Sequence, residues 1–205
     1  MTEQRTEQWL LDRLGHVTAS KADCVLAGKE TAKRQGYIIQ LVTERLTGQV
    51  QDSFTNSAMA WGTEQEPVAR AVYQSTLAGD LFVEETGFVK HPTIEWLGAS
   101  PDGLVGDGLV EIKCPNSTTH VEYLMDGKVP AKYKPQMMVQ MLCTQRKWCD
   151  FVSFDPRLPE DLQLFVVRFE PKQEELDKIE SAIKDFLTEV DKATNKLRSK
   201  HGSRV

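Results

Sequence analysis

The spacing of apolar residues changes part-way along this chain of 205 residues, and that change limits the possible folds most. Residues 37–47 and 55–77 place apolar side chains at helical intervals, whereas apolar and polar residues alternate within residues 81–113. Gly, Pro and Asp residues divide the alternating stretch into segments that we predict to be strands: Leu81–Val83, Gly87–Lys90, Glu95–Ser100 and Leu109–Lys113. Helices next to short strands predict an α/β (α+β) fold.

Further elements are predicted on both sides of this stretch. The predicted helices cover residues 2–12, a short segment from Ser20 to Leu26, and residues 117–126 and 135–145; the predicted strands cover 151–154 and 162–168. A last helix, about 172–199, repeats apolar residues in steps of three and four, which suits packing on the chain's own core or, less favoured, a contact between subunits. The length suits one domain, 1–205.

The overall charge restricts the classes of function. The net charge is −5 at pH 7, which argues against a protein that coats DNA, because such proteins are basic. The charge does not exclude a nuclease. A site for Mg²⁺ needs carboxylates, and basic residues can gather in one channel.

The sequence also indicates a cellular compartment. No apolar run approaches the length of a membrane span, and the segment after Met1 lacks the apolar stretch of a signal peptide. We therefore expect a cytoplasmic protein with no membrane partner. None of the four cysteines (Cys24, Cys114, Cys143 and Cys149) forms a C-x-x-C pair, which predicts reduced thiols and no zinc or redox motif.

The stretch from Ser100 to Lys113 is the part most indicative of chemistry. Glu111 and Lys113 are two residues apart on a predicted strand, so both side chains point to one face. Asp102 ends the preceding strand, and a Gly-rich hairpin would return it beside Glu111. Two carboxylates with one ammonium suit phosphodiester hydrolysis with Mg²⁺ or Mn²⁺, and the backbone carbonyl of Ile112 could be a further metal ligand. The alternative is a surface hairpin with an exposed Glu/Lys pair.

Two helices flank this hairpin and strengthen the nuclease interpretation. Glu66 on the upstream helix could supply a third carboxylate. Gln136 and Gln140 on the downstream helix are four residues apart, so they share a face and interrupt an apolar run. Amides in such a run predict a helix that lies along a site, although two exposed polar positions of an amphipathic helix would give the same pattern.

A third feature lies near the start of the chain. Arg13 precedes two hydroxyl residues, Thr18 and Ser20, which are good caps for the short helix that follows. An arginine and two hydroxyls at a helix N-terminus suit the binding of a phosphate. A simple helix cap is the alternative.

In order and spacing, these segments resemble the PD-(D/E)xK nuclease superfamily, and more narrowly the phage lambda exonuclease family, also called the YqaJ-type viral recombinases. The resemblance runs from about Trp9 to Arg157. The matching segments are Trp9-x3-Arg13-x-Gly-x-x-Thr-Ala-Ser20, Ala60-Trp-Gly-x3-Glu66, Ser100-Pro-Asp-Gly, Glu111-x-Lys-Cys-Pro115, Gln136 and Asp155-Pro-Arg157.

The resemblance implies a restriction-endonuclease-like core, with a mixed central β-sheet flanked by helices. It implies 5′-to-3′ digestion of one strand of linear duplex DNA to mononucleotides, which leaves a 3′ single-stranded tail for phage-type recombination by single-strand annealing. It further implies a ring-shaped homotrimer around DNA ends, a single-strand annealing protein as partner, and a phage or prophage gene expressed in a bacterial cytoplasm.

The resemblance also implies roles for individual residues. Asp102 and Glu111 match the metal ligands, Lys113 the catalytic lysine, and Glu66 a helical carboxylate that assists a second Mg²⁺ or Mn²⁺ ion. Gln136 matches a glutamine that positions the nucleophile or substrate. Arg13 matches the arginine that binds the 5′ phosphate, with Ser20 in the same loop, and Met59 takes the place of an apolar wedge that separates the terminal base pair.

The sequence departs from the superfamily at one position and leaves other functions open. Gln140 stands where many superfamily members have tyrosine, four residues after the glutamine. Cys143 and Cys149 do not form the set that holds an iron–sulfur cluster, so we predict no cluster. The alternatives are a site-specific or repair endonuclease with the same core, a catalytically inactive DNA-end-binding protein, and a phage structural protein with a fortuitous hairpin.

Overall fold

The computed structural model describes residues 4–51, 57–77 and 81–201. Its α-helices are α1 Glu7–Arg13, α2 Ala22–Val25, α3 Ala32–Thr47, α4 Ser57–Thr76, α5 Ser117–Asp126, α6 Lys134–Thr144 and α7 Gln173–His201. Its strands are β1 Val17–Thr18, β2 Val89–Lys90, β3 Leu97–Ala99, β4 Gly103–Val105, β5 Gly108–Lys113, β6 Cys149–Phe154 and β7 Leu164–Phe169. Short 3₁₀ helices lie at η1 Ala19–Lys21, η2 Ala131–Tyr133 and η3 Glu160–Leu162.

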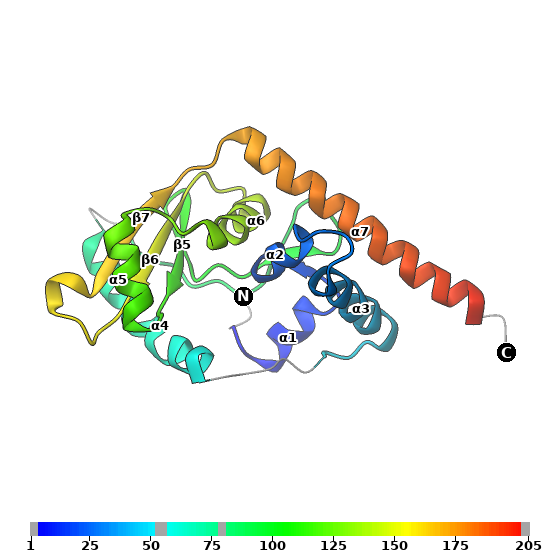
Figure 1. Ribbon diagram of the computed structural model, residues 1–205, viewed down its shortest axis with the longest axis horizontal. Helices are drawn as coiled ribbons and strands as arrows, with labels where there is room; N and C mark the ends of the chain where they lie inside the picture. Colours follow the sequence, from blue (N-terminus) through cyan, green and yellow to red (C-terminus); the bar gives the residue numbers. More distant parts are fainter. Residues whose placement is uncertain (1–3, 52–56, 78–80, 202–205) are drawn as a thin grey trace.

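The strands form two mixed sheets flanked by helices (Figure 1), which confirms the predicted fold class. In the larger sheet, with order β4-β5-β6-β7, β5 and β6 are parallel and the other pairs are antiparallel. In the smaller sheet, with order β1-β3-β2, β1 and β3 are parallel and β2 and β3 are antiparallel.

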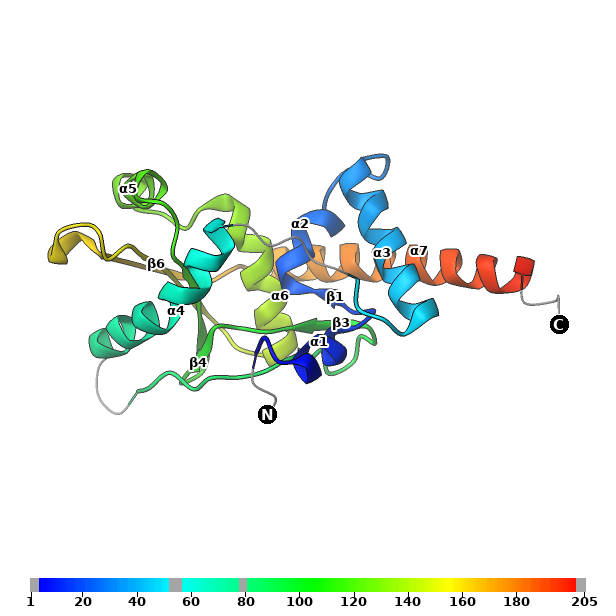
Figure 2. The same cartoon turned by 90° about the horizontal axis from the view of Figure 1, so that it is seen from below.

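The central strand β5 is covered by helices on both faces. Val110 and Ile112 lie in one apolar cluster with Ala69 and Tyr73 of α4. Leu109 lies in the other cluster, whose members include residues of α6 and α7. Because side chains alternate along a strand, Glu111 shares the face of Leu109 and points toward α6. Figure 2 shows α4 and α6 on either side of this strand.

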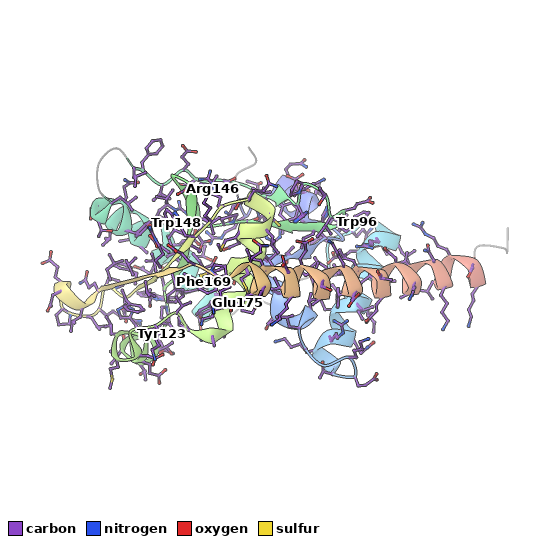
Figure 3. The ribbon with its side chains drawn as sticks, turned by 90° about the horizontal axis from the view of Figure 1, so that it is seen from above. Trp96, Tyr123, Arg146, Trp148, Phe169 and Glu175 are labelled. Atoms are coloured by element: carbon purple, nitrogen blue, oxygen red, sulfur yellow. The ribbon has the colours of Figure 1, made fainter. Side chains whose placement is uncertain are left out.

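The long helix α7 packs on the chain's own core, as favoured from the sequence. Its residues Ile179, Ile183, Phe186 and Val190 are buried, and α3 and α6 are its main neighbours. Leu197, the last residue of the apolar stripe, is 42% exposed. In Figure 3, Glu175, in the first turn of α7, lies near Phe169, the last residue of β7, and the helix runs past the other elements.

Two strand predictions and one turn prediction are wrong. Leu81–Val83 is not a strand, and near it only an isolated bridge joins Glu84 to Leu104. Glu95–Ser100 shortens to β3, which pairs in the smaller sheet and not with β5. The Gly-rich stretch assigned to a turn contains the strand β4.

The physical reason for β4 is its close contact with residues before it. A Cβ atom at Gly103 would lie 2.2 Å from Cγ1 of Val83, so only glycine lets the two segments approach. The turn between β4 and β5 reduces to two residues, of which Gly106 has a φ of +54°.

Helix ends follow local caps more than apolar spacing. The helix predicted at 2–12 begins at Glu7, because the side chain of Thr6 accepts a hydrogen bond from the Trp9 N–H. The helix predicted at 37–47 begins earlier, at Ala32, with Thr31 as its cap. α4 runs through Pro67.

In the part of the chain that the structure describes, no helix combines the length and apolar character needed to cross a membrane.

Candidate active site

The β4–β5 hairpin sets Asp102 against Glu111. Gly103 pairs with Val110, so the residue before Gly103 falls opposite the residue after Val110. The backbone N–H of Ile112 donates to Oδ2 of Asp102 at 2.7 Å. The predicted placement of Asp102 is therefore confirmed, although β4, and not the preceding strand, brings it there.

Glu111 is fully buried, and both of its carboxylate oxygens have partners. Nε2 of Gln136 donates to Oε1 at 2.6 Å, and Nε2 of Gln140 donates to Oε2 at 2.5 Å. Lys113, on the same face of β5, forms an ion pair with Oε1. A buried carboxylate is stable only when it is paired in this way. The surface-hairpin alternative is thus excluded, and α6 lies along the site as predicted.

Lys113 is held as an ammonium. Burial by itself would lower its pKa, but the negative charges of Glu111 and Asp102 outweigh burial and raise the pKa of Lys113 above its usual value. Its Nζ also lies 5.3 Å from the ring centroid of Tyr133. In this state the side chain supplies positive charge and hydrogen-bond donors to the site.

Negative charge is in excess around Asp102. Burial and the nearby charges of Glu111 and Glu66 raise the pKa of Asp102 well above its usual value, and Lys113 opposes this only in part. Hard carboxylate oxygens with excess negative charge fit a divalent cation such as Mg²⁺ or Mn²⁺.

The side chains are not yet arranged around a cation. Among the described residues, no group of three or more His, Cys, Asp or Glu side chains is placed to hold a metal ion. The oxygens of Glu111 are directed to amides and to Lys113, and Glu66 is directed to arginines. The donor types fit a metal, and Asp102, Glu111, Glu66 and the carbonyl of Ile112 are the groups that would hold it.

Glu66 has two cationic partners that the sequence did not indicate. Oε2 pairs with Arg5, and Oε1 lies 2.8 Å from Nη2 of Arg70. The spacing of four residues on one helix could have identified Arg70. Arg5 is 61 residues away in sequence, so no local pattern could have identified it.

The guanidinium of Arg13 lies over the ring of a tryptophan beside the site. Its Cζ is 4.0 Å from the ring centroid of Trp9, and Nε1 of Trp9 donates to Oγ of Ser100, two residues before Asp102. Burial lowers the pKa of Arg13, while Tyr37 and Glu44 act in the opposite direction. Stacking leaves the edge of the guanidinium available to an anion.

The hydroxyl residues after Arg13 do not cap a helix as predicted. Thr18 precedes η1, but its side chain makes no capping hydrogen bond, and its Oγ1 lies 3.3 Å from Oγ of Ser20. The cause is a strand: β1 ends at Thr18, so its backbone pairs with β3, and its N–H donates to the hydroxyl of Tyr37. Tyr37 is thereby a common neighbour of Thr18 and Arg13.

Met59 lies in the first turn of α4, seven residues before Glu66, and is 52% exposed. Its side chain is therefore not part of the core.

A family model described as the YqaJ-like viral recombinase domain matches residues 8–147, which include Arg13, Glu66, Asp102, Glu111 and Lys113. The chain belongs to the YqaJ-like viral recombinase family. The resemblance to the lambda exonuclease family inferred from the sequence is confirmed.

Solved structures support membership of the recombinase family. The chain is 46% identical to an alkaline exonuclease (LHK-Exo) from Laribacter hongkongensis, in two crystal structures, one of them with dAMP. Each match has a TM-score of 0.90 and covers 98% of this chain and 100% of the other. A phage-related exonuclease from Haemophilus somnus 129PT, 16% identical, matches with a TM-score of 0.70 over 89% of this chain and 96% of its own, which shows the shared fold. No curated protein gives a significant match.

This recombinase-family chain has a second glutamine at the centre of the site. Gln140 is fully buried, and its amide donates directly to the carboxylate of Glu111. Its Oε1 has no hydrogen-bond partner. The four cysteines are buried and free.

The charge on Asp102 predicts a stability effect in the recombinase-family fold. Because its pKa is raised, the folded state keeps a proton that the unfolded state loses, so metal-free stability falls as pH rises from the unfolded pKa to the folded pKa. Asp102→Asn removes this penalty, and its amide oxygen can still accept from Ile112. We expect a higher Tm than the unmodified chain at pH 8 without metal, with about 2–4 °C for each kcal/mol recovered.

Calorimetry with EDTA at pH 8 and at pH 3.5 tests this effect. The difference in Tm should shrink at the acid pH, where Asp102 is mostly protonated in the unfolded state as well as in the folded state. An Asp102→Asn protein that is less stable than the unmodified chain at pH 8 contradicts the charge assignment.

Proposed function

We propose that this chain is a metal-dependent exonuclease that digests one strand of linear duplex DNA from 5′ to 3′ and releases mononucleotides. The observation that supports it is the buried Glu111, joined to Lys113, Gln136 and Gln140, with Asp102 opposite. The remaining 3′ single-stranded tail suits recombination by annealing. The exonuclease activity itself is supported by the near-complete coverage of LHK-Exo at 46% identity.

In the proposed reaction, the ammonium of Lys113 stabilises negative charge on the phosphoryl oxygens and orients the attacking water. Gln136 and Gln140 fix the carboxylate of Glu111, so that its orientation does not depend on substrate. A bound Mg²⁺ or Mn²⁺, with a second ion near Glu66, would lower the pKa of a water and neutralise phosphate charge.

The loop after α1 is the proposed site for the 5′ phosphate. Arg13 supplies the charge, and the adjacent hydroxyls of Thr18 and Ser20 supply further hydrogen bonds. Met59, exposed at the start of α4, is the proposed wedge between the terminal bases. A structure of LHK-Exo contains dAMP, a deoxynucleoside monophosphate of the product class expected here.

The proposal includes an assembly and a setting. The chain would act as one nuclease domain, residues 1–205, in a homotrimeric ring around the DNA end. Its partner would be a single-strand annealing protein that takes up the 3′ tail. The setting would be the cytoplasm of a bacterial host, with the gene on a phage or prophage.

The direct test is digestion of linear duplex DNA with a 5′ phosphate, labelled at the 5′ or the 3′ end, with closed circular plasmid alongside. With Mg²⁺ we expect early release of the 5′ label as mononucleotide, a persistent 3′ label and an intact circle. EDTA should stop the reaction.

The other outcomes identify the other functions. Nicked or linearised circles would show an endonuclease with the same core. Binding to DNA ends without cleavage under Mg²⁺ or Mn²⁺ would show an inactive end-binding protein.

A further inference from the structure

The C-terminal part of α7 differs in charge from the rest of the helix. Residues 173–191 contain seven acidic and two basic residues. Residues 192–200 contain four basic residues, namely Lys192, Lys196, Arg198 and Lys200, and no acidic residue. All four are exposed. A chain with a net charge of −5 therefore gathers positive charge at one end of one helix.

Three of these residues form a continuous row, which we call the lysine stripe: Lys192, Lys196 and Lys200. They are four residues apart, so they follow one another along one face in steps of about 6 Å. Val190 and Thr194, which are buried, lie on the opposite side, about 200° around the helix from Lys192 and Lys196. The stripe therefore faces away from the core.

The acidic residues that precede the stripe are already neutralised by the body of the molecule. Glu189 lies 2.9 Å from Nη2 of Arg34, and Asp191 lies 2.6 Å from Nη1 of Arg45. Over residues 4–51, 57–77 and 81–201, the stripe lysines take part in no ion pair. Figures 1 and 2 show the end of α7 extending beyond α3 and every other element. Its positive charge is thus uncompensated and accessible.

We propose that the lysine stripe binds the phosphate backbone of duplex DNA away from the catalytic centre. This inference rests on the proposed function in one respect, namely that duplex DNA is the substrate. Each lysine replaces condensed counterions on one phosphate, which gives affinity without dependence on sequence. Such a contact would keep an acidic enzyme on a polyanion while nucleotides leave the end.

The composition of the face favours nucleic acid over a second copy of the chain. Protein contacts have apolar centres that are poor in lysine. Most neighbours of the stripe are polar, and the nearest large apolar side chain, Leu197, is turned toward the core side of the helix, about 60° from Lys200 and about 100° from Lys196. Contacts with DNA are polar and positively charged.

The test compares two triple variants with equal charge. The first, Lys192→Gln with Lys196→Gln and Lys200→Gln, removes the stripe. The control replaces three other exposed lysines with glutamine: Lys147, Lys172 and Lys178. Both change the net charge from −5 to −8. Binding to a 30-base-pair duplex closed by a hairpin at each end is measured by anisotropy in EDTA, so that no cleavage occurs, from 50 to 200 mM salt.

The stripe variant should bind at least tenfold more weakly at 50 mM salt. Its plot of log affinity against log salt should be less steep by up to about 2.7, since each phosphate contact contributes about 0.9. The control should keep the slope of the unmodified chain, and Lys192→Arg with Lys196→Arg and Lys200→Arg should restore it. Circular dichroism checks that the helix is intact.

Equal slopes for the stripe and control variants would overturn the inference. So would a change of mass in sedimentation that accounts for the loss of binding, because the stripe would then join copies of the chain. Cleavage of labelled linear DNA is scored separately. A chain that cleaves DNA but binds independently of the stripe refutes only this inference, and a chain that never cleaves refutes only the proposed function.

Discussion

Lys113→Ala is expected to reduce hydrolysis of linear duplex DNA by about 10²- to 10⁴-fold while the chain stays folded. The side chain is the only cation in ion-pair contact with Glu111 among the described residues, and it faces the space beside Asp102. Without it, charge that develops on the phosphoryl oxygens loses its nearest ammonium. Glu111 keeps hydrogen bonds from two amides, those of Gln136 and Gln140, so its buried carboxylate still has partners and the fold is retained.

Single-turnover rates with Mg²⁺ and a melting curve measure this prediction. The matched control is Lys147→Ala, which removes a lysine with 81% side-chain exposure at the opposite end of the β5–β6 pair. Native rates in Lys113→Ala would show that the catalytic centre lies elsewhere.

Glu111→Gln is expected to lower activity by about 10³-fold or more, because a lost metal ligand removes several kcal/mol of transition-state stabilisation. It should also abolish the rise in Tm that Mg²⁺ or Ca²⁺ gives the unmodified chain. The stability cost should be smaller than the 3–5 kcal/mol typical of a broken buried ion pair. Gln140 can rotate its amide so that Oε1, which has no partner, accepts from the new side chain.

Calorimetric titration with Ca²⁺ and melting curves with and without metal separate the two effects. Glu122→Gln, on the exposed face of α5, is the control for loss of one carboxylate. Metal binding that survives Glu111→Gln would remove Glu111 from the proposed ligand set.

Some of the site could be predicted because it depends on local geometry. Glu111 and Lys113 share a face because strand side chains alternate, and Gln136 and Gln140 share one because four residues make about one helical turn. The order of the motifs from Trp9 to Arg157 added the family, which the match over residues 8–147 confirmed.

Other parts could not be predicted, because distant segments decide them. The strand β4 forms where Gly103 allows the side chain of Val83 to pack closely against its backbone. The sequence pattern within residues 103–108 does not reveal this contact. Arg5 reaches Glu66 across 61 residues. Thr18 does not cap a helix, because it is the last residue of β1 and its backbone pairs with β3.

The sequence by itself determined the fold class and which short-range pairs of side chains point together, since these follow from periodicity and spacing, and the resemblance of its ordered motifs indicated the family. Only the tertiary structure decided the electrostatic state of the site. Burial and the charges of Glu111 and Glu66 raise the pKa of Asp102. The charges of Glu111 and Asp102 raise the pKa of Lys113. Desolvation and Coulomb interactions depend on distance in space, and a linear sequence does not contain those distances.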